Sequence, residues 1–141
     1  MKNLLILLLL PVSSTLFGQQ NDTSQNTNLQ LSDSVFRMVE VESYFPGGDL
    51  LWNKYVQSKI EKGLKKLLKD KKSNGTCEVQ FIVNTDGGII NVEALTLTDS
   101  YLAKIFVNAV KESPKWVPAY QSGKPVKAWR RQKVTFKRPV D

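Results

Sequence analysis

The sequence predicts an α+β fold in two layers, with elements in the order β-α-β-β-α-β and a three-stranded antiparallel sheet that carries two helices on one face. The first observation is a pair of alternating segments, 76–83 and 89–97, joined by a turn-forming sequence. The second is a pair of stretches, 49–69 and 99–113, with apolar residues at helical spacing. The length of 141 residues allows one modest domain of this kind.

The central hairpin is the clearest element. Its first strand, 76–83, places four residues on one apolar face, namely Cys77, Val79, Phe81 and Val83. The turn at 84–88 (NTDGG) contains residues that tolerate a positive φ, as a tight hairpin turn requires. We therefore expect the chain to reverse there and to return as a second strand over 89–97.

The helices flank this hairpin. Gly48 or Asp49 is expected to cap the first helix, which reaches about residue 60, is interrupted at Gly63 and resumes to about residue 69. Asp99 is expected to cap the second helix, and Pro114 is expected to end it. The predicted apolar faces consist of Leu51, Trp52, Tyr55 and Val56 in the first helix, and of Leu102, Ile105, Phe106, Ala109 and Val110 in the second.

Two outer strands complete the predicted order. The alternation in 39–42 predicts a short first strand, and 125–136 predicts a long final strand rich in Val, Trp, Arg and Thr. Between the second helix and the final strand, Trp116 and Pro118 predict an irregular crossing, followed by a turn at 121–124. We expect Trp116 to pack beneath the sheet.

The N-terminus has the composition of an export signal. A short positive start, an apolar run over 4–10 and a small residue at Gly18 predict a signal peptide over 1–18 and a periplasmic protein. An uncleaved inner-membrane anchor is the alternative, although the apolar run is shorter than the roughly 20 residues that a span needs. Residues 19–28 contain no aliphatic or aromatic side chain, so 19–38 is predicted to be a disordered polar linker and 39–138 the domain.

The residue types argue against an enzyme. The chain has no histidine and a single cysteine, Cys77, which the predicted strand places on its apolar face. The acidic residues are scattered, and Asp49, Asp86 and Asp99 are each explained by a cap or a turn. The turn at 84–88 resembles the start of a calcium loop but lacks the closing glutamate. We expect no catalysis, no metal and no cofactor.

The net charge of +7 is concentrated in two places. Seven lysines lie in 59–72, where they form either a solvated helix face or a surface for anionic membrane. The final strand is also basic, and its charges would discourage self-pairing at a sheet edge. Because the chain is expected to be exported, we do not expect nucleic acid as a partner.

An edge strand can also bind. Its unpaired N–H and C=O groups can accept a peptide as an additional strand, and Arg130 or Arg131 could pair with an acidic partner. The predicted partner-binding residues are Val126, Lys127, Ala128, Trp129, Arg130, Arg131, Gln132, Lys133 and Val134.

The succession FIVNTDGGIINVEAL at 81–95 and KESPKWVPAYQSGKPVKAWRRQKVTF at 111–136 resembles the C-terminal domain of TonB-type energy transducers. The segment YFPGGDLLW at 44–52 is similar to versions typical of Bacteroidetes. The resemblance covers about 41–136 and implies the same three-stranded sheet with two helices.

In that family the domain binds the TonB box of an outer-membrane receptor beside its last strand, here 126–136. Full-length members also carry a membrane anchor and a long Pro-rich linker, which couple the domain to inner-membrane motor proteins. Residues 19–34 would span at most about 55 Å, so we expect a periplasmic TonB-like domain, with the motor as a partner only if the N-terminus is an anchor. The alternatives are a basic cell-envelope or membrane-surface binding protein, and a homodimer through the edge strand.

Overall fold

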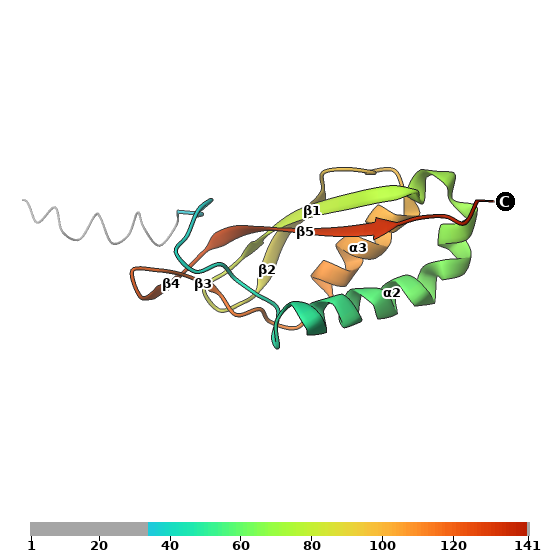
Figure 1. The fold of residues 1–141 in the computed structure, drawn as a ribbon. Helices are drawn as coiled ribbons and strands as arrows, with labels where there is room; N and C mark the ends of the chain where they lie inside the picture. The colour runs from blue at the N-terminus through green and yellow to red at the C-terminus, as the bar shows by residue number, and fades with distance from the viewer. Residues whose placement is uncertain (1–33, 141) are drawn as a thin grey trace, which may run out of the picture.

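A three-stranded antiparallel sheet with strand order β2-β1-β5 forms one layer of the protein. Its strands are β1 (Gly75–Val83), β2 (Ile89–Ala94) and β5 (Ala128–Phe136). Helices α2 (Asp49–Lys69) and α3 (Tyr101–Lys111) cover one face of it (Figure 1). This confirms the predicted two-layer α+β fold. The structure is a computed structural model that describes residues 34–140, so the predicted signal peptide and residues 19–33 of the predicted linker lie outside it.

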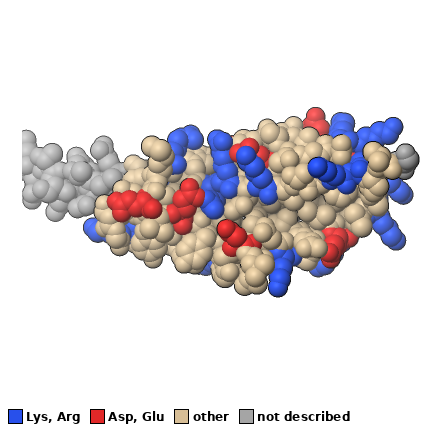
Figure 2. Space-filling model, in the orientation of Figure 1, with Lys and Arg blue, Asp and Glu red and all other residues tan. Residues whose placement is uncertain are grey.

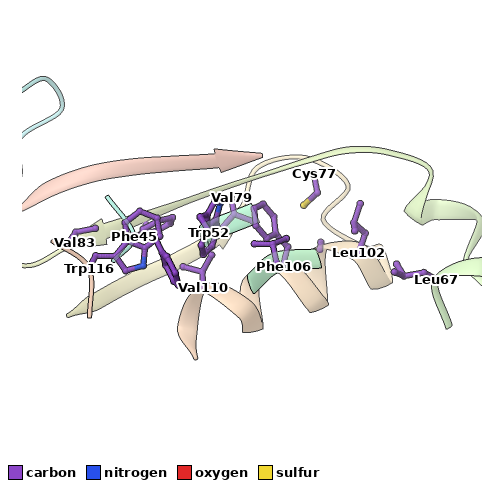
Figure 3. Close-up of a cluster of buried hydrophobic side chains, with 13 residues drawn as sticks. Phe45, Trp52, Leu67, Cys77, Val79, Val83, Leu102, Phe106, Val110 and Trp116 are labelled. Carbon is purple, nitrogen blue, oxygen red and sulfur yellow. The ribbon is translucent and has the colours of Figure 1, made fainter. Parts of the chain in front are cut away.

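The core lies between β1 and the helices. The apolar face of β1 is buried as the alternation predicts, and Phe81 and Val79 are fully buried there. Figure 3 shows Val79 in one cluster with residues of both helices and of the crossing segment 112–118, among them Trp52, Phe106 and Trp116. The ring centroid of Trp116 lies 5.1 Å from that of Phe81 and 5.2 Å from that of Trp52. Trp116 therefore packs beneath the sheet, as expected, and joins it to α2.

The predicted interruption of the first helix at Gly63 is wrong, because α2 is continuous from Asp49 to Lys69. A Cβ atom at Gly63 would lie 2.3 Å from Cδ1 of Ile105 in α3. Glycine at this position thus lets the two helices approach each other closely. Close packing of the two helices, and not a break in α2, therefore explains why glycine occupies position 63.

The cap of α3 also differs from the prediction. Ser100, and not Asp99, is the N-cap, and its hydroxyl accepts a hydrogen bond of 3.0 Å from the Ala103 N–H. The short 3₁₀ helix η1 (Lys71–Ser73) brings Asp70 to the same place. Asp70 accepts hydrogen bonds of 2.6 Å from the Ser73 hydroxyl and from the Tyr101 N–H, and these bonds lower the pKa of its carboxyl group. One carboxylate thus ties the end of α2 to the start of α3.

The predicted first strand at 39–42 does not form. Only isolated bridges occur there and nearby, between Val41 and Tyr120 and between Tyr44 and Val117. The chain bends between Arg37 and Glu40, so only single residues face a partner strand. This segment crosses beside the sheet and does not join it.

The predicted final strand at 125–136 is divided. Its first part is β4 (Lys124–Val126), which pairs with β3 (Ala119–Gln121) in a separate two-stranded sheet. The turn between them has positive φ at Ser122 and Gly123, as the sequence predicts for 121–124. After Lys127, β5 alone continues along β1. The partner strand predicted over 89–97 is also shorter, because β2 ends at Ala94.

Candidate partner-binding edge

Strand β5 forms one edge of the three-stranded sheet. It pairs with β1 without interruption from Val83↔Ala128 to Gly75↔Phe136. The opposite edge, β2, is shorter, and its register with β1 shifts near Asn91, which has a φ of 52°. A short, irregular strand is a poor template for another strand, whereas a long, regular one is a good template. The geometry therefore favours β5 as the binding edge.

The side chains of β5 alternate between two faces. Arg130 lies opposite Phe81, so it shares the helix-covered face of the sheet with the buried side of β1. Trp129 and Arg131 lie opposite Ile82 and Gln80, on the face that no helix covers. A hydrogen bond of 2.8 Å between the hydroxyls of Thr76 and Thr135 lies on this open face.

The backbone of β5 alternates as well. The Trp129 N–H points away from β1, because it donates a hydrogen bond of 2.9 Å to the carbonyl oxygen of Phe36. By the alternation of strand geometry, the N–H and C=O groups of Arg131, Lys133 and Thr135 point outward too. Within residues 34–140, none of these outward groups makes a hydrogen bond. Five residues of edge, 131–135, are thus available for strand addition.

The open face beside this edge carries excess positive charge. Arg131 and Lys133 share the carboxylate of Glu78, at 3.5 Å and 3.8 Å. Two cations on one carboxylate leave a net positive charge, and exposed pairs of this kind contribute little to stability. The edge therefore offers unpaired backbone groups beside a cationic surface.

At the start of β5 the surface is hollowed into a cavity of about 310 Å³. It is lined by Arg37, Glu42, Gln80, Trp129, Arg130 and Arg131. The Glu42 carboxylate forms an ion pair with Arg130, whose pKa is lowered by burial. The Nε atom of Arg130 is buried and has no hydrogen-bond partner in the described residues. The guanidinium of Arg37 lies over the Trp129 ring, 5.4 Å from its centroid.

Comparison with known protein families identifies the domain. Residues 66–138, just over half of the chain, match the family described as the Gram-negative bacterial TonB protein C-terminal domain. The chain belongs to this family. No curated protein and no solved structure shows a significant match to it. The TonB C-terminal domain is a non-enzymatic protein-interaction domain of the cell envelope, linked to TonB-dependent transport, and the family generally binds outer-membrane receptors.

In this TonB C-terminal domain the predicted site residues do not all lie on one edge. Val126 belongs to β4, where it pairs with Ala119. Lys127 follows it, and the Lys127 carbonyl oxygen accepts a hydrogen bond from Phe36. Three of the other predicted residues, Val126, Ala128 and Arg130, lie before the available edge at 131–135. Gln132 and Val134 lie within it, but their backbone N–H and C=O groups point toward β1. Arg131 and Lys133 combine the outward groups with the exposed charge.

Sequence reasoning missed the contribution of Phe36, Arg37 and Glu42 to this region, and it stopped one residue short of Thr135. The aromatic residue at 36, just after a polar stretch, is the signal that could have found the first of them. The pairing of Glu42 with Arg130 leaves no local signal, because 88 positions separate the two residues.

No helix within residues 34–140 combines the length and the apolar character needed to cross a bilayer.

Proposed function

We propose that this TonB C-terminal domain binds the TonB-box peptide of an outer-membrane receptor by adding it as a strand to the edge of β5. The single observation that carries the proposal is the row of outward backbone groups at Arg131, Lys133 and Thr135, which make no hydrogen bond in the described residues. Backbone pairing would supply affinity, and the positive charge of Arg131 and Lys133 would favour an acidic partner surface.

The proposal includes a location and a domain organisation. Residues 1–18 would serve as a signal peptide, 19–38 as a linker and 39–138 as the binding domain in the periplasm. If residues 1–18 remained as an anchor, inner-membrane motor proteins would be further partners. Homodimerisation through β5 would compete with the receptor, since both use the same backbone groups.

Backbone methylation of the ligand tests the proposal. We expect a synthetic receptor N-terminal peptide to shift the amide signals of Arg131, Lys133 and Thr135 in an NMR titration. A peptide N-methylated at alternate residues on the side that faces β5 loses two or three hydrogen bonds, so its affinity should fall by about tenfold or more.

The matched control is the same peptide N-methylated at the intervening residues, whose N–H groups point away from β5. It should bind as the unmodified peptide does. Equal losses from both methylation patterns, or shifts confined to β2, would contradict strand addition at β5.

A second candidate function, binding to an anionic membrane surface, is favoured by the arrangement of charge at one end of the molecule. The Arg138 N–H donates a hydrogen bond of 3.0 Å to the Asn74 side chain, which brings the basic tail beside η1. Figure 2 shows Lys and Arg gathered at this end. Within residues 34–140, Lys65, Lys69 and Lys72 form no ion pair. Clusters of four to eight cations bind anionic lipid through roughly 1 kcal/mol for each charge near the surface.

Vesicle co-sedimentation separates the two functions. Phosphatidylglycerol vesicles should retain the protein at low salt and release it at high salt. The triple change Lys65→Gln, Lys69→Gln and Lys72→Gln should abolish retention, whereas Lys54→Gln, Lys104→Gln and Lys124→Gln, with the same charge change, should not. Equal retention by phosphatidylcholine would contradict this second function.

A further inference from the structure

The segment 36–42, named the strap here, lies against the start of β5. Figure 1 shows this blue-green segment beside the strand. Phe36 forms a parallel bridge with Ala128. Its N–H donates a hydrogen bond of 2.9 Å to the Lys127 carbonyl, and its carbonyl accepts one of 2.9 Å from the Trp129 N–H. The strap therefore uses the outward backbone groups of β5 in the way that an added strand would.

The side chains of the strap strengthen this contact. Glu42 pairs with Arg130, and Arg37 lies over the ring of Trp129. Each contact holds a side chain at the start of β5, the part of the edge that Phe36 occupies. The strap thus makes three kinds of contact with the edge, namely backbone pairing, an ion pair and a cation–π contact.

A partner strand and the strap cannot both occupy the first part of the edge. The Trp129 N–H is already satisfied by Phe36, and the next outward groups, at Arg131, are not. A ligand that pairs along the whole of β5, which is nine residues long, must therefore displace Phe36. The strap also lies outside residues 66–138, the part of the chain that matches the family.

We infer that the strap is an internal competitor for the partner-binding edge, and that a partner strand must displace it to pair with the whole of β5. The inference rests on the proposed function, because it concerns the regulation of the same site. The apparent affinity equals the affinity of the open form multiplied by the fraction of molecules in which the strap is open. A strap that is closed nine-tenths of the time weakens binding about tenfold.

Substitutions within the full-length chain test the inference. Glu42→Gln removes the ion pair with Arg130. Phe36→Pro removes the N–H that bonds to Lys127. Both variants should bind a synthetic receptor N-terminal peptide at least about threefold more tightly than the unmodified protein, because a larger fraction of the molecules is open. Affinity is measured by calorimetry, and amide exchange at Trp129 reports release of the strap without any ligand.

The matched control is Glu40→Gln. It makes the same charge change two residues away, but Glu40 contacts Gln121 and not Arg130. It should leave the affinity and the exchange of the Trp129 amide unchanged.

The outcomes separate the inference from the proposed function. Tighter binding in Glu42→Gln and Phe36→Pro, with faster Trp129 exchange, supports both. Unchanged or weaker binding in those variants overturns the inference and leaves the proposed function standing. Absence of peptide binding in every variant, including those with an exposed edge, overturns the proposed function and the inference with it.

Discussion

Replacing Gly87 with alanine is expected to destabilise the domain by about 3 kcal/mol. Gly87 has a φ of 84°, in the left-handed region where a side chain costs about 1–2 kcal/mol. A Cβ atom there would lie 2.1 Å from the backbone carbonyl oxygen of Trp116, which cannot move as a flexible side chain could. The resulting overpacking costs about 1–3 kcal/mol more. Urea unfolding followed by circular dichroism measures the change in the free energy of unfolding.

Gly123→Ala is the matched control. Gly123 also has a positive φ, 74°, but a Cβ atom there would meet nothing within 4 Å. This variant should lose only the backbone contribution, about 1 kcal/mol. The difference between the two variants isolates the contact with Trp116. Equal losses of stability in the two variants would mean that the close contact with the Trp116 carbonyl does not exclude a side chain at position 87.

The same contact shows why the hairpin could be predicted but its surroundings could not. The turn at 84–88 is local chemistry, since residues that tolerate positive φ stand between two alternating strands. The Trp116 N–H, however, donates a hydrogen bond of 3.0 Å to the Gly87 carbonyl from 29 positions away. Nothing in the sequence around Gly87 encodes that partner.

Gly63 shows, within a helix, the same limit of prediction from local sequence. Helix propensity alone predicts a weak point at this residue, because glycine costs about 1 kcal/mol relative to alanine. The structure shows instead that Ile105 and Tyr101 of α3 lie where a side chain would be. Tertiary packing overrides propensity here, and a single sequence carries no sign of which helix will pack on which.

The candidate edge was only partly predictable for a related reason. The alternation in 128–136 and its charge indicate an edge strand, and the structure places β5 at the edge of the sheet. The division at Lys127 depends on a separate pairing, of β4 with β3. The strap depends on contacts of Phe36 and Glu42 with residues more than 85 positions away. Long-range pairing of this kind is set by the fold and not by local pattern.

Replacing Trp116 with alanine should have the largest effect on stability, a loss of about 4 kcal/mol. The side chain is 2% exposed and contacts the rings of Phe81, Trp52 and Phe45 at centroid distances of 5.1, 5.2 and 5.9 Å. The indole N–H also donates a hydrogen bond of 3.0 Å to the Ser113 hydroxyl. The substitution would leave a large cavity where the sheet, α2 and the crossing segment meet. Urea unfolding provides the measurement.

Trp116→Phe separates packing from hydrogen bonding. It keeps an aromatic ring among the same neighbours and removes the indole N–H, so we expect a loss of about 1–2 kcal/mol. A loss as large as that of the alanine variant would show that the bond to Ser113, and not the burial of the ring, dominates the contribution of Trp116. Because Trp116 lies in the core and the proposed binding site lies at the edge of β5, the folded fraction of either variant should bind a receptor peptide with the affinity of the unmodified protein. A weakened affinity in that folded fraction would mean that the core sets the geometry of the edge, and the two properties could then not be varied independently.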